Sequence, residues 1–585
     1  MCGICGELRF DGSSPDFDIL AKMMASLARR GPDDSGYFIK QNIGLGHRRL
    51  SVIDLSNHAH QPMLEQNLAL VFNGTIYNYP TLQRELSSLG HIFQSNSDTE
   101  VILKAYKQWG EDSVSHLQGM FAFAIWDGNK LFLARDRLGI KPLYYSQTPT
   151  RFRFASTLPA LLTTGDIDTN IDPIALHHHL TLHAVVPAPH TLLQGVRKLA
   201  PATTLTLSLK QQSPTPKRYW QLRPQAQNYT SEQWIEKTRT TLQSAVDSHL
   251  HIADTPVGVL LSGGLDSSLL VGLLADNVKD LLTFSIGFED IPEEQGSEFE
   301  YSDQVVARYK TNHHRYTIPN EQVLTRLPEA IAAMSEPMVG QDAVAFYLLA
   351  EIVSKQVKVV LSGQGADEAF AGYFWYPLMQ TAQGTNLERF TPYYFDRSHA
   401  EFLQTVHPDY HGEDYTSQLI DSSLTADKDG TFLDKVLRLD LTKLIVDDPV
   451  KRVDNMTMAW GLEARVPFLD HKLIELATSI PAALKLQENG KYPLKAIARD
   501  LLPSSVIDRP KGYFPMPALK YVRGPFLEFM RDVLNSDVCR QRQLFQRSYV
   551  DKLLAAPEQY MTPLQGNKLW HLALLEKWLQ LMINP

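Results

Sequence analysis

The chain has few cysteines, no excess of basic residues and no long apolar run, and each lack excludes a class of protein. Three cysteines among 585 residues are too few for a disulfide framework, which indicates a reducing compartment. Lys and Arg total 56 against 65 Asp and Glu, so the basic excess of a nucleic-acid-binding protein is missing. No apolar run reaches the ~18 residues of a membrane span, and the first residues lack a basic-then-apolar signal pattern. We therefore expect a cytoplasmic protein that binds neither nucleic acid nor membrane.

The sequence also lacks a GxxxxGK[ST] motif, so any nucleotide site must use another kind of phosphate loop. Val257–Leu270, VGVLLSGGLDSSLL, offers one: an apolar run stops at two glycines and helix formers follow, which predicts a buried strand, a tight turn and a helix start. Such a turn points backbone N–H groups at a phosphate, and the hydroxyls of Ser262, Ser267 and Ser268 add donors. Asp266 would repel the phosphate, so its carboxylate is expected to hold Mg²⁺. The alternative is an ordinary strand–helix turn.

The chain opens MCGICGELRF, which places a cysteine directly after the first methionine. Removal of Met1 would give Cys2 a thiol and a free α-amino group, whose pKa near about 8 suits it as base for that thiol. A redox pair with Cys5 is the alternative. Because a redox CxxC normally follows a strand in a thioredoxin-like unit, we expect Cys5 to be a core residue instead.

Five short segments behind Cys2 have the order and spacing of class-II glutamine amidotransferases, which this half of the chain resembles: Arg30–Asp33, Gly46–Ser51, Phe72–Gly74, Ser97–Glu100 and Gly119–Phe123. Hydrolysis of a glutamine amide needs a thiolate, an oxyanion hole and a clamp on the α-carboxylate and α-ammonium. The Asn73 amide and the Gly74 N–H suit the oxyanion. Arg49 suits the carboxylate and Asp98 the ammonium, and the resemblance implies the same roles.

Two segments depart from this family. Thr75 stands where a glutamate usually follows Asn-Gly, so Asp98 and backbone carbonyls are expected to hold more of the substrate ammonium. Ala155–Pro159, ASTLP, replaces the serine-glutamate-x-lysine run found where the two active sites of related enzymes are joined. We therefore expect the two sites to communicate differently here.

Four histidines stand close together in Leu176–His183, LHHHLTLH. On a helix His179 and His183 would share a face and form a ligand pair for a metal. No Cys, Asp or Glu lies close by in the sequence to complete the shell, and Pro187 soon ends the element. We therefore favour a polar helix face at the domain junction over a metal site.

The second half predicts a parallel α/β sheet. A helix is expected over Gln233–Ile252 and strands over Leu281–Phe288 and Val357–Leu361, the last running into SGQGADE. Because the carboxyl ends of parallel strands share one edge, Asp367 should meet Asp266 there and hold Mg²⁺ with it. Taken alone, the GADE segment (Gly365–Glu368) fits the capped start of a helix equally well.

The SGGLDSS loop and the GLEARVPFLDH run, Gly461–His471, resemble the ATP-pyrophosphatase domain of asparagine synthetases. The resemblance implies that Lys495 stabilises charge while ammonia attacks or pyrophosphate leaves. Gln364 replaces an acidic residue of many members, and Gln364 and Lys511 are candidate contacts of an acyl-adenylate. Glu463 and Arg465 are expected to pair near the site. The implied ATP contacts are Leu261, Ser262, Gly263, Gly264, Asp266, Ser267, Ile286, Ser362 and Gly363.

The length predicts roughly two to four domains. From the resemblance we expect an α+β N-terminal nucleophile (Ntn) glutaminase domain of stacked antiparallel sheets at 1–208. A Gln- and Pro-rich linker at 209–228 would join it to an α/β ATP-pyrophosphatase domain with a parallel sheet at 229–585. The polar stretch from about 384 to 431 matches nothing in this family, which indicates a substrate-specific insertion or lid.

The chain as a whole resembles glutamine-dependent amidotransferases of asparagine synthetase type. The resemblance implies that Cys2 releases ammonia from glutamine through a thioester, that ATP and Mg²⁺ convert a carboxylate to an acyl-AMP, and that ammonia crosses an internal tunnel to it. The opening MCGICGELRF, Thr75, the STLP run and AWGLEARVPFLDH look most like the N-acetylglutaminylglutamine amidotransferase branch, whose members make a dipeptide amide used as an osmoprotectant.

Other acceptors and activities stay open. Aspartate is the second candidate acceptor, which would make the chain an ordinary asparagine synthetase. A cyclising ligase of β-lactam synthetase type and a non-catalytic scaffold are further alternatives. The expected partners are small molecules, and the oligomeric state is open, with a homodimer as one option.

Overall fold

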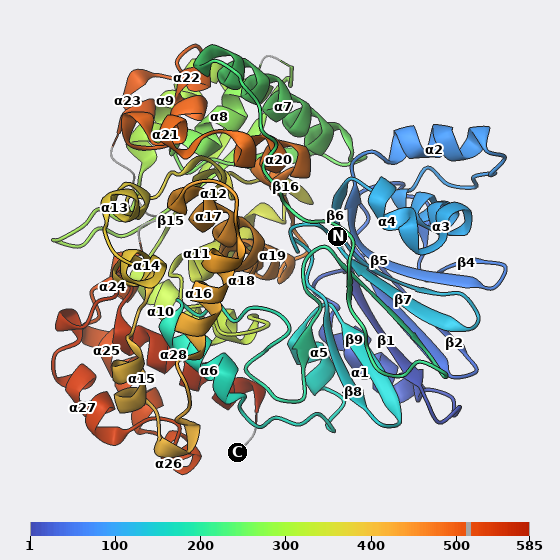
Figure 1. The fold of residues 1–585 in the computed structure, drawn as a ribbon, viewed down its shortest axis with the longest axis horizontal. Coiled ribbons are helices and arrows are strands. Elements are labelled where there is room, and N and C mark those ends of the chain that lie inside the picture. Colours follow the sequence, from blue (N-terminus) through green and yellow to red (C-terminus); the bar gives the residue numbers. More distant parts are fainter. Residues whose placement is uncertain (1, 276, 510–515, 584–585) are drawn as a thin grey trace.

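The computed structural model describes residues 2–275, 277–509 and 516–583. Its first half forms two stacked antiparallel sheets, and its second half forms a parallel sheet surrounded by helices. In Figure 1 the stacked sheets, blue to cyan, lie beside the helical half, which runs from green to red. This is the pair of folds expected from the resemblance.

The first sheet of the first half has the strand order β10-β8-β9-β1-β3-β2, and the second has the order β12-β11-β7-β6-β5-β4. Side chains along these strands point alternately to the two faces of each sheet. The apolar side chains on the two faces that meet form one buried layer, which includes Ile4, Val71 and Phe154. The first sheet contains β1 (Gly3–Arg9), β2 (Asp34–Lys40), β3 (Ile43–Arg49), β8 (Tyr144–Thr148), β9 (Arg151–Ala155) and β10 (Arg197–Lys198). The second contains β4 (Met63–Glu65), β5 (Leu68–Ile76), β6 (Gly119–Trp126), β7 (Lys130–Arg135), β11 (Thr203–Ser208) and β12 (Lys217–Arg218).

Helices cover the two outer faces. On the second sheet, α2 (Tyr79–Ser88) and α3 (Asp98–Trp109) bury Leu86 and Ile102 against a cluster that includes Phe123. On the first sheet, α1 (Phe17–Ser26) and α5 (Leu158–Leu162) pack into the cluster that contains Cys5. Cys5 is fully buried and forms no disulfide. The prediction that it is a core residue is therefore confirmed.

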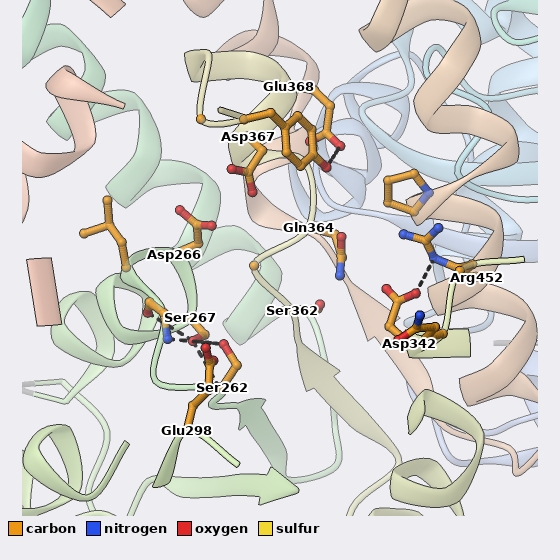
Figure 2. A pocket seen from close by; sticks show the side chains of 18 of the residues that line it. Ser262, Asp266, Ser267, Glu298, Asp342, Ser362, Gln364, Asp367, Glu368 and Arg452 are labelled. Carbon is orange, nitrogen blue, oxygen red and sulfur yellow. Dashed lines mark hydrogen bonds and ion pairs between the residues drawn. The ribbon is translucent and has the colours of Figure 1, made fainter. Parts of the chain in front are cut away.

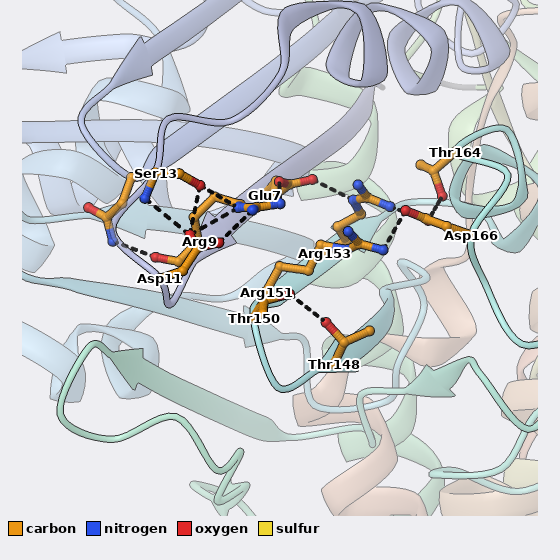
Figure 3. Close-up of polar contacts among 11 residues, drawn as sticks. Glu7, Arg9, Asp11, Ser13, Thr148, Thr150, Arg151, Arg153, Thr164 and Asp166 are labelled. Atoms are coloured by element: carbon orange, nitrogen blue, oxygen red, sulfur yellow. Dashed lines mark hydrogen bonds and ion pairs between the residues drawn. The ribbon is translucent and has the colours of Figure 1, made fainter.

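An ion network ties the strands at the end of β1 that lies far from Cys2 (Figure 3). Arg153 of β9 contacts Glu7 of β1 and Asp166 beyond α5, both at 2.5 Å. Arg9 contacts Asp11 in the following turn at 2.6 Å. These pairs fix the register of β1 against β9, and that register sets the position of Cys2 at the other end of the strand.

The second half is built on a five-stranded parallel sheet of order β15-β14-β13-β16-β17. Its central strand, β13 (Val257–Leu260), is the neighbour of β16 (Val359–Leu361), so the loops that leave the carboxyl ends of these two strands converge. The helix over Ser231–His251 (α7) and the strand β14 (Leu282–Phe288) agree with the sequence-based prediction. The outer strands are β15 (Asn312–Ile318) and β17 (Glu463–Arg465), and the helices next to the site are α8 (Leu265–Leu274), α11 (Asp342–Val353), α12 (Ala366–Phe370), α19 (Pro449–Met458) and α22 (Tyr492–Ala498).

The stretch 384–431 is helical. It contains α14 (Asn386–Tyr394), α15 (His399–Thr405) and α16 (Tyr415–Ala426), and it packs on α6 (Pro173–Thr181) from the first half. The C-terminal helix α28 (Lys568–Met582) lies against the same region through Arg397, which donates to the Lys568 carbonyl. None of the helices in the described residues combines the length and apolar character that crossing a bilayer requires.

Buried ion pairs connect the two halves. Asp454 of α19 contacts Arg30 at 3.0 Å and Lys141 at 2.8 Å, and all three side chains are buried. Removal of one partner from such a pair leaves an uncompensated buried charge and typically costs about 3–5 kcal/mol. The relative position of the halves is therefore specified by charge as well as by apolar contact.

Candidate active sites

The thiol of Cys2 lies at the start of β1, in a nearly closed site. The Cys2 backbone nitrogen donates to Asn73 Oδ1 at 3.1 Å, and its carbonyl accepts from Arg30 Nε at 3.3 Å. Burial raises the pKa of the thiol, which the positive charge of Arg49 opposes. The site therefore contains three of the residues expected from the sequence, together with Arg30.

The oxyanion donors expected at Asn73 and Gly74 lie on β5 beside this thiol. The buried Asn73 Nδ2 has no hydrogen-bond partner within the described part of the chain, so it is available to an oxygen bound next to Cys2. At position 74 a Cβ would come within 2.1 Å of the Met120 carbonyl oxygen on β6, which excludes any side chain. The glycine thus allows the close pairing of β5 and β6 that holds Asn73 in place.

The two groups expected to clamp glutamine are held by backbone contacts. Arg49, at the end of β3, donates to the carbonyls of Asp54 at 2.5 Å and Ser56 at 3.1 Å, which orients its guanidinium. Asp98 begins α3 and accepts the Ile76 N–H at 3.0 Å. Burial raises the pKa of Asp98 to about 7, so this carboxyl loses its proton near neutral pH.

A carboxylate from the second half of the chain reaches the thiol site. Thr75 donates to Glu463 Oε1 at 3.1 Å, and Arg465 Nε contacts the same oxygen at 2.5 Å. Burial disfavours this charge, but the positive charges of Arg465 and Lys141 contribute to a net lowering of the pKa of Glu463 to about 2. The expected pairing of Glu463 with Arg465 is confirmed. Its place beside Cys2 was not predicted, although an unexplained Thr75 hydroxyl next to the oxyanion residues was a signal.

A separate cavity of about 620 Å³ opens at the carboxyl edge of the parallel sheet. Figure 2 shows Asp266 and Ser267 on one side of it, Asp342 and Arg452 on the other, with Ser362 and Gln364 between. All expected ATP contacts except Gly263 line it, and Lys495 does too. A volume of this size suits a nucleotide together with a second small molecule.

The turn that follows β13 has the shape of a phosphate loop. Gly263 has a φ of +83°, and a Cβ there would lie 2.8 Å from the Ser302 nitrogen. The Ser262 and Ser267 hydroxyls lie 3.0 Å apart and brace the turn. Ser268, the next residue on α8, is fully buried and does not line the cavity, which disagrees with the expectation that its hydroxyl donates to phosphate. Successive side chains of a helix point in different directions, so Ser268 faces away from the cavity that Ser267 lines.

The two acids expected at the sheet edge do meet, with a lysine between them. Lys491 Nζ lies 2.6 Å from Asp266 and 2.7 Å from Asp367. Mg²⁺ binds through one or two carboxylates and the phosphates of its nucleotide, so these oxygens fit the ion. Lys495, one turn later on α22, donates to the Glu488 carbonyl. Burial, together with the nearby positive charges, lowers the pKa of Lys495. The central place of Lys491 was missed, since both of its acid partners lie more than 100 residues away in the sequence.

Paired charges lie on the other side of the cavity, and aromatic rings also line it. Arg452 contacts Asp342 at 3.0 Å and also pairs with Asp448 on its own helix. The rings of Tyr373 and Trp375 stack with their centroids 4.2 Å apart. The side that carries Asp342 and Arg452 has no part in the phosphate turn after β13, so it is available to a second substrate.

The histidines of α6 do not follow the expected pattern. The helix ends at Thr181, so His179 and His183 do not share a helical face, and His177 to His179 are buried. The acids absent from the nearby sequence come from the stretch 384–431: His177 lies near Asp414, and His183 near Asp396. A search along the sequence missed both acids because they follow more than 200 residues later.

The cysteine site and the ATP-sized cavity together define a class of enzyme: an Ntn glutaminase fused to an ATP-pyrophosphatase domain, a glutamine-hydrolysing carbon–nitrogen ligase. The family models agree. The glutamine amidotransferase domain model matches residues 1–220, and the asparagine synthase model matches residues 237–580. The chain belongs to the asparagine synthase family. Lys511, expected near pyrophosphate, lies outside the described residues.

Curated relatives match over most of their length. Asparagine synthetase [glutamine-hydrolyzing] 1 of Bacillus subtilis is 31% identical, with 99% of this chain and 96% of that protein covered. Asparagine synthetase [glutamine-hydrolyzing] 3 of the same organism is also 31% identical, over 95% and 93%. A more distant match, named amidase chyE, of Penicillium rubens, is 28% identical over 87% of each chain. Asparagine synthetases use ATP, so the family and the cavity agree on the nucleotide.

Proposed function

We propose that this enzyme amidates the carboxylate of N-acetylglutaminylglutamine, using ammonia from glutamine and energy from ATP. Its product would be the terminal amide of that dipeptide, an osmoprotectant. The cysteine site supplies the ammonia and the cavity activates the acceptor.

In the glutaminase half, the Cys2 thiolate attacks the side-chain amide carbon of glutamine. The α-amino group of Cys2, free once Met1 is removed, takes the thiol proton and passes it to the leaving ammonia. Asn73 Nδ2 and the Gly74 N–H stabilise the oxyanion. Water then hydrolyses the thioester and releases glutamate. Arg49 and Asp98 hold the α-carboxylate and α-ammonium of the substrate.

In the synthetase half, an acceptor carboxylate oxygen attacks the α-phosphorus of ATP, and pyrophosphate leaves. The turn at Ser262–Gly264 and Ser267 binds phosphate, and Ile286 lies against the base. Mg²⁺, held by Asp266 and Asp367, would neutralise pyrophosphate. Ammonia then attacks the acyl carbon, AMP departs, and the nitrogen loses a proton. Lys495, Gln364 and Lys511 are proposed to hold the acyl-adenylate, with Lys495 stabilising the developing charge.

The ion pairs of the basic side chains in the cavity are the observation that supports the dipeptide as acceptor. Among the described residues that line it, each basic side chain apart from Lys495 contacts a carboxylate: Lys491 contacts Asp266 and Asp367, Arg452 contacts Asp342 and Asp448, Arg509 contacts Glu298, Lys520 contacts Glu294, and His183 contacts Asp396. Aspartate brings a second carboxylate, which needs a cation of its own. The dipeptide carries one carboxylate and several amides, which suit hydrogen-bonding and aromatic walls.

Aspartate is the second candidate, and the relatives named asparagine synthetase favour it. A cyclising ligase needs no glutaminase, so the assembled glutaminase site around Cys2 disfavours that function. Pyrophosphate release with ATP, Mg²⁺ and glutamine separates these functions. Release with N-acetylglutaminylglutamine and not with aspartate supports the proposal. Release with aspartate alone overturns the proposed acceptor and leaves the ligase class intact.

A further inference from the structure

His183 comes from the first half of the chain but lines the cavity of the second half. It follows the end of α6 with a φ of +52°, and Ala184 follows with a φ of +61°. Residues other than glycine rarely adopt this left-handed conformation, which costs roughly 1 kcal/mol or more and persists where the surrounding structure imposes it. Here two backbone bonds impose it: the N–H groups of Ala184 and Val185 donate to the carbonyls of His179 at 2.9 Å and Leu182 at 2.9 Å.

A buried carboxylate orients the ring of His183. Its Nδ1 lies 3.1 Å from Asp396 Oδ2, and the Asp396 N–H donates to the Thr181 carbonyl at 2.8 Å. His571 Nδ1 lies 3.4 Å from the same oxygen, so two imidazoles face Asp396. Burial opposes a charged ring, but the hydrogen bond and charge of Asp396, together with the charge of Asp448, raise the pKa of His183.

The remaining ring nitrogen of His183 is available to a ligand. Nε2 has no hydrogen-bond partner within the described residues, and the side chain lines the cavity. Its charge interacts with Arg452 and Asp448, so it belongs to the side of the cavity where Figure 2 shows Asp342 and Arg452, across Gln364 from Asp266. With Nδ1–H directed at Asp396, the charged ring presents Nε2–H as a donor.

A metal ion is a weaker explanation of this cluster. The ligand atoms of His183, Asp396 and His571 lie within 4.8 Å of one another, which is close enough for a shared cation. The guanidinium charges of Arg397 and Arg452 act on these histidines and would repel such an ion. The surroundings therefore favour an oxygen ligand over a cation.

We propose that His183 is a specificity-determining residue, whose Nε2–H binds a carbonyl oxygen of the acceptor distant from the carboxylate that is activated. This inference rests on the proposed function, because N-acetylglutaminylglutamine has such oxygens in its amide and acetyl groups. Asp396 acts through His183 as a positioning residue. The first half of the chain thus takes part in choosing the substrate of the second half.

ATP–pyrophosphate exchange with N-acetylglutaminylglutamine tests the proposal. His183→Leu should raise the KM for the dipeptide about tenfold or more, as expected for loss of a hydrogen bond from a charged donor. The KM for ATP and the glutaminase rate should stay unchanged, which also shows that the variant folds. His183→Gln, which keeps a hydrogen-bond donor, should raise the KM for the dipeptide by less. N-acetylglutamine, which is one residue shorter than the dipeptide, should inhibit wild type and His183→Leu equally.

Matched variants separate binding from structure. His177→Gln alters a buried α6 histidine that contacts Thr416 and His399 outside the cavity, and it should leave the dipeptide KM unchanged. Asp396→Asn should raise that KM with no change in the KM for ATP. An unchanged dipeptide KM in His183→Leu, or an equal rise in the KM for ATP, overturns the role of His183. Wild type that exchanges with aspartate alone, or with neither acid, overturns the proposed acceptor and this inference with it.

Discussion

Thr75 donates a hydrogen bond of 3.1 Å to Glu463, and the two residues stand 388 positions apart in the chain. Thr75 follows the two oxyanion residues of the glutaminase, whereas Glu463 begins the last strand of the synthetase sheet. Burial raises the pKa of both Cys2 and Asp98, and the negative charge of Glu463 adds to this rise. The synthetase half therefore takes part in setting the electrostatics of the thiol site. A substitution that breaks the contact between Thr75 and Glu463 should affect both halves.

The first prediction concerns this contact. Glu463→Gln should destabilise the protein by about 3 kcal/mol, since it leaves the buried guanidinium of Arg465 without its charge partner. Urea unfolding of the whole chain measures the effect. The control is Glu293→Gln, which breaks an exposed pair with Arg523 and should change stability by no more than about 1 kcal/mol. Equal effects from the two variants would contradict the account of this contact.

The second prediction separates the two active sites. Cys2→Ala should abolish activity with glutamine but leave amide formation from ammonium salts, because the acceptor is activated in another cavity. Amide formation with each nitrogen source is the measurement. Cys5→Ala, which removes a core thiol, is the matched control and should keep glutamine-dependent activity. Loss of the ammonium-driven reaction in a folded Cys2→Ala variant would contradict two independent sites.

The third prediction concerns the acids at the sheet edge. Asp266→Asn should stop ATP–pyrophosphate exchange, because one of the two carboxylates proposed to hold Mg²⁺ is lost. Glutaminase activity should survive at least in part, since Cys2 lies in the other half. Asp303→Asn, on the exposed surface in a pair with Arg315, is a control of equal chemistry. Continued exchange in Asp266→Asn would rule out its metal role.

The fourth prediction is a pH dependence. Burial raises the pKa of Asp98 to about 7, well above its ordinary value of 3.8. The group is therefore protonated below pH 7, and only its charged form attracts the α-ammonium of glutamine. Glutamine affinity should be full above this pKa and fall as the pH drops through it. The Kd of glutamine for Cys2→Ala, which has no catalytic thiol to titrate, measures this between pH 5 and 8.

Asp98→Asn provides the control for that titration. The amide carries no charge at any pH in this range, so its glutamine affinity should be weak and nearly flat. A profile for Cys2→Ala that does not weaken below pH 7 would remove Asp98 from the ammonium clamp.

Parts of both sites could be predicted from the sequence because local patterns encode them. An apolar run that ends in two glycines marks the phosphate turn, and the parallel sheet brings Asp266 and Asp367 to one edge. Contacts between distant segments left no such pattern. Nothing near Thr75 indicates Glu463, and nothing near His183 indicates Asp396. Such contacts depend on how the halves and the helices of 384–431 pack, and packing has no period along the chain.

Backbone conformation was the other gap. A helical pattern through LHHHLTLH predicts that His183 continues α6, yet the helix ends at Thr181 and His183 takes a left-handed conformation. The sequence offers no glycine there to signal it. Two local backbone hydrogen bonds hold this conformation instead, and the contact with the distant Asp396 orients the ring.

Isotope labelling shows whether nitrogen passes from the glutaminase half to the synthetase half inside the enzyme. The enzyme is supplied with ATP, Mg²⁺, N-acetylglutaminylglutamine, glutamine labelled with ¹⁵N in its side-chain amide, and an excess of unlabelled ammonium. The account predicts that the new amide carries ¹⁵N despite the unlabelled pool. An amide nitrogen with the isotopic composition of the bulk ammonium would contradict it.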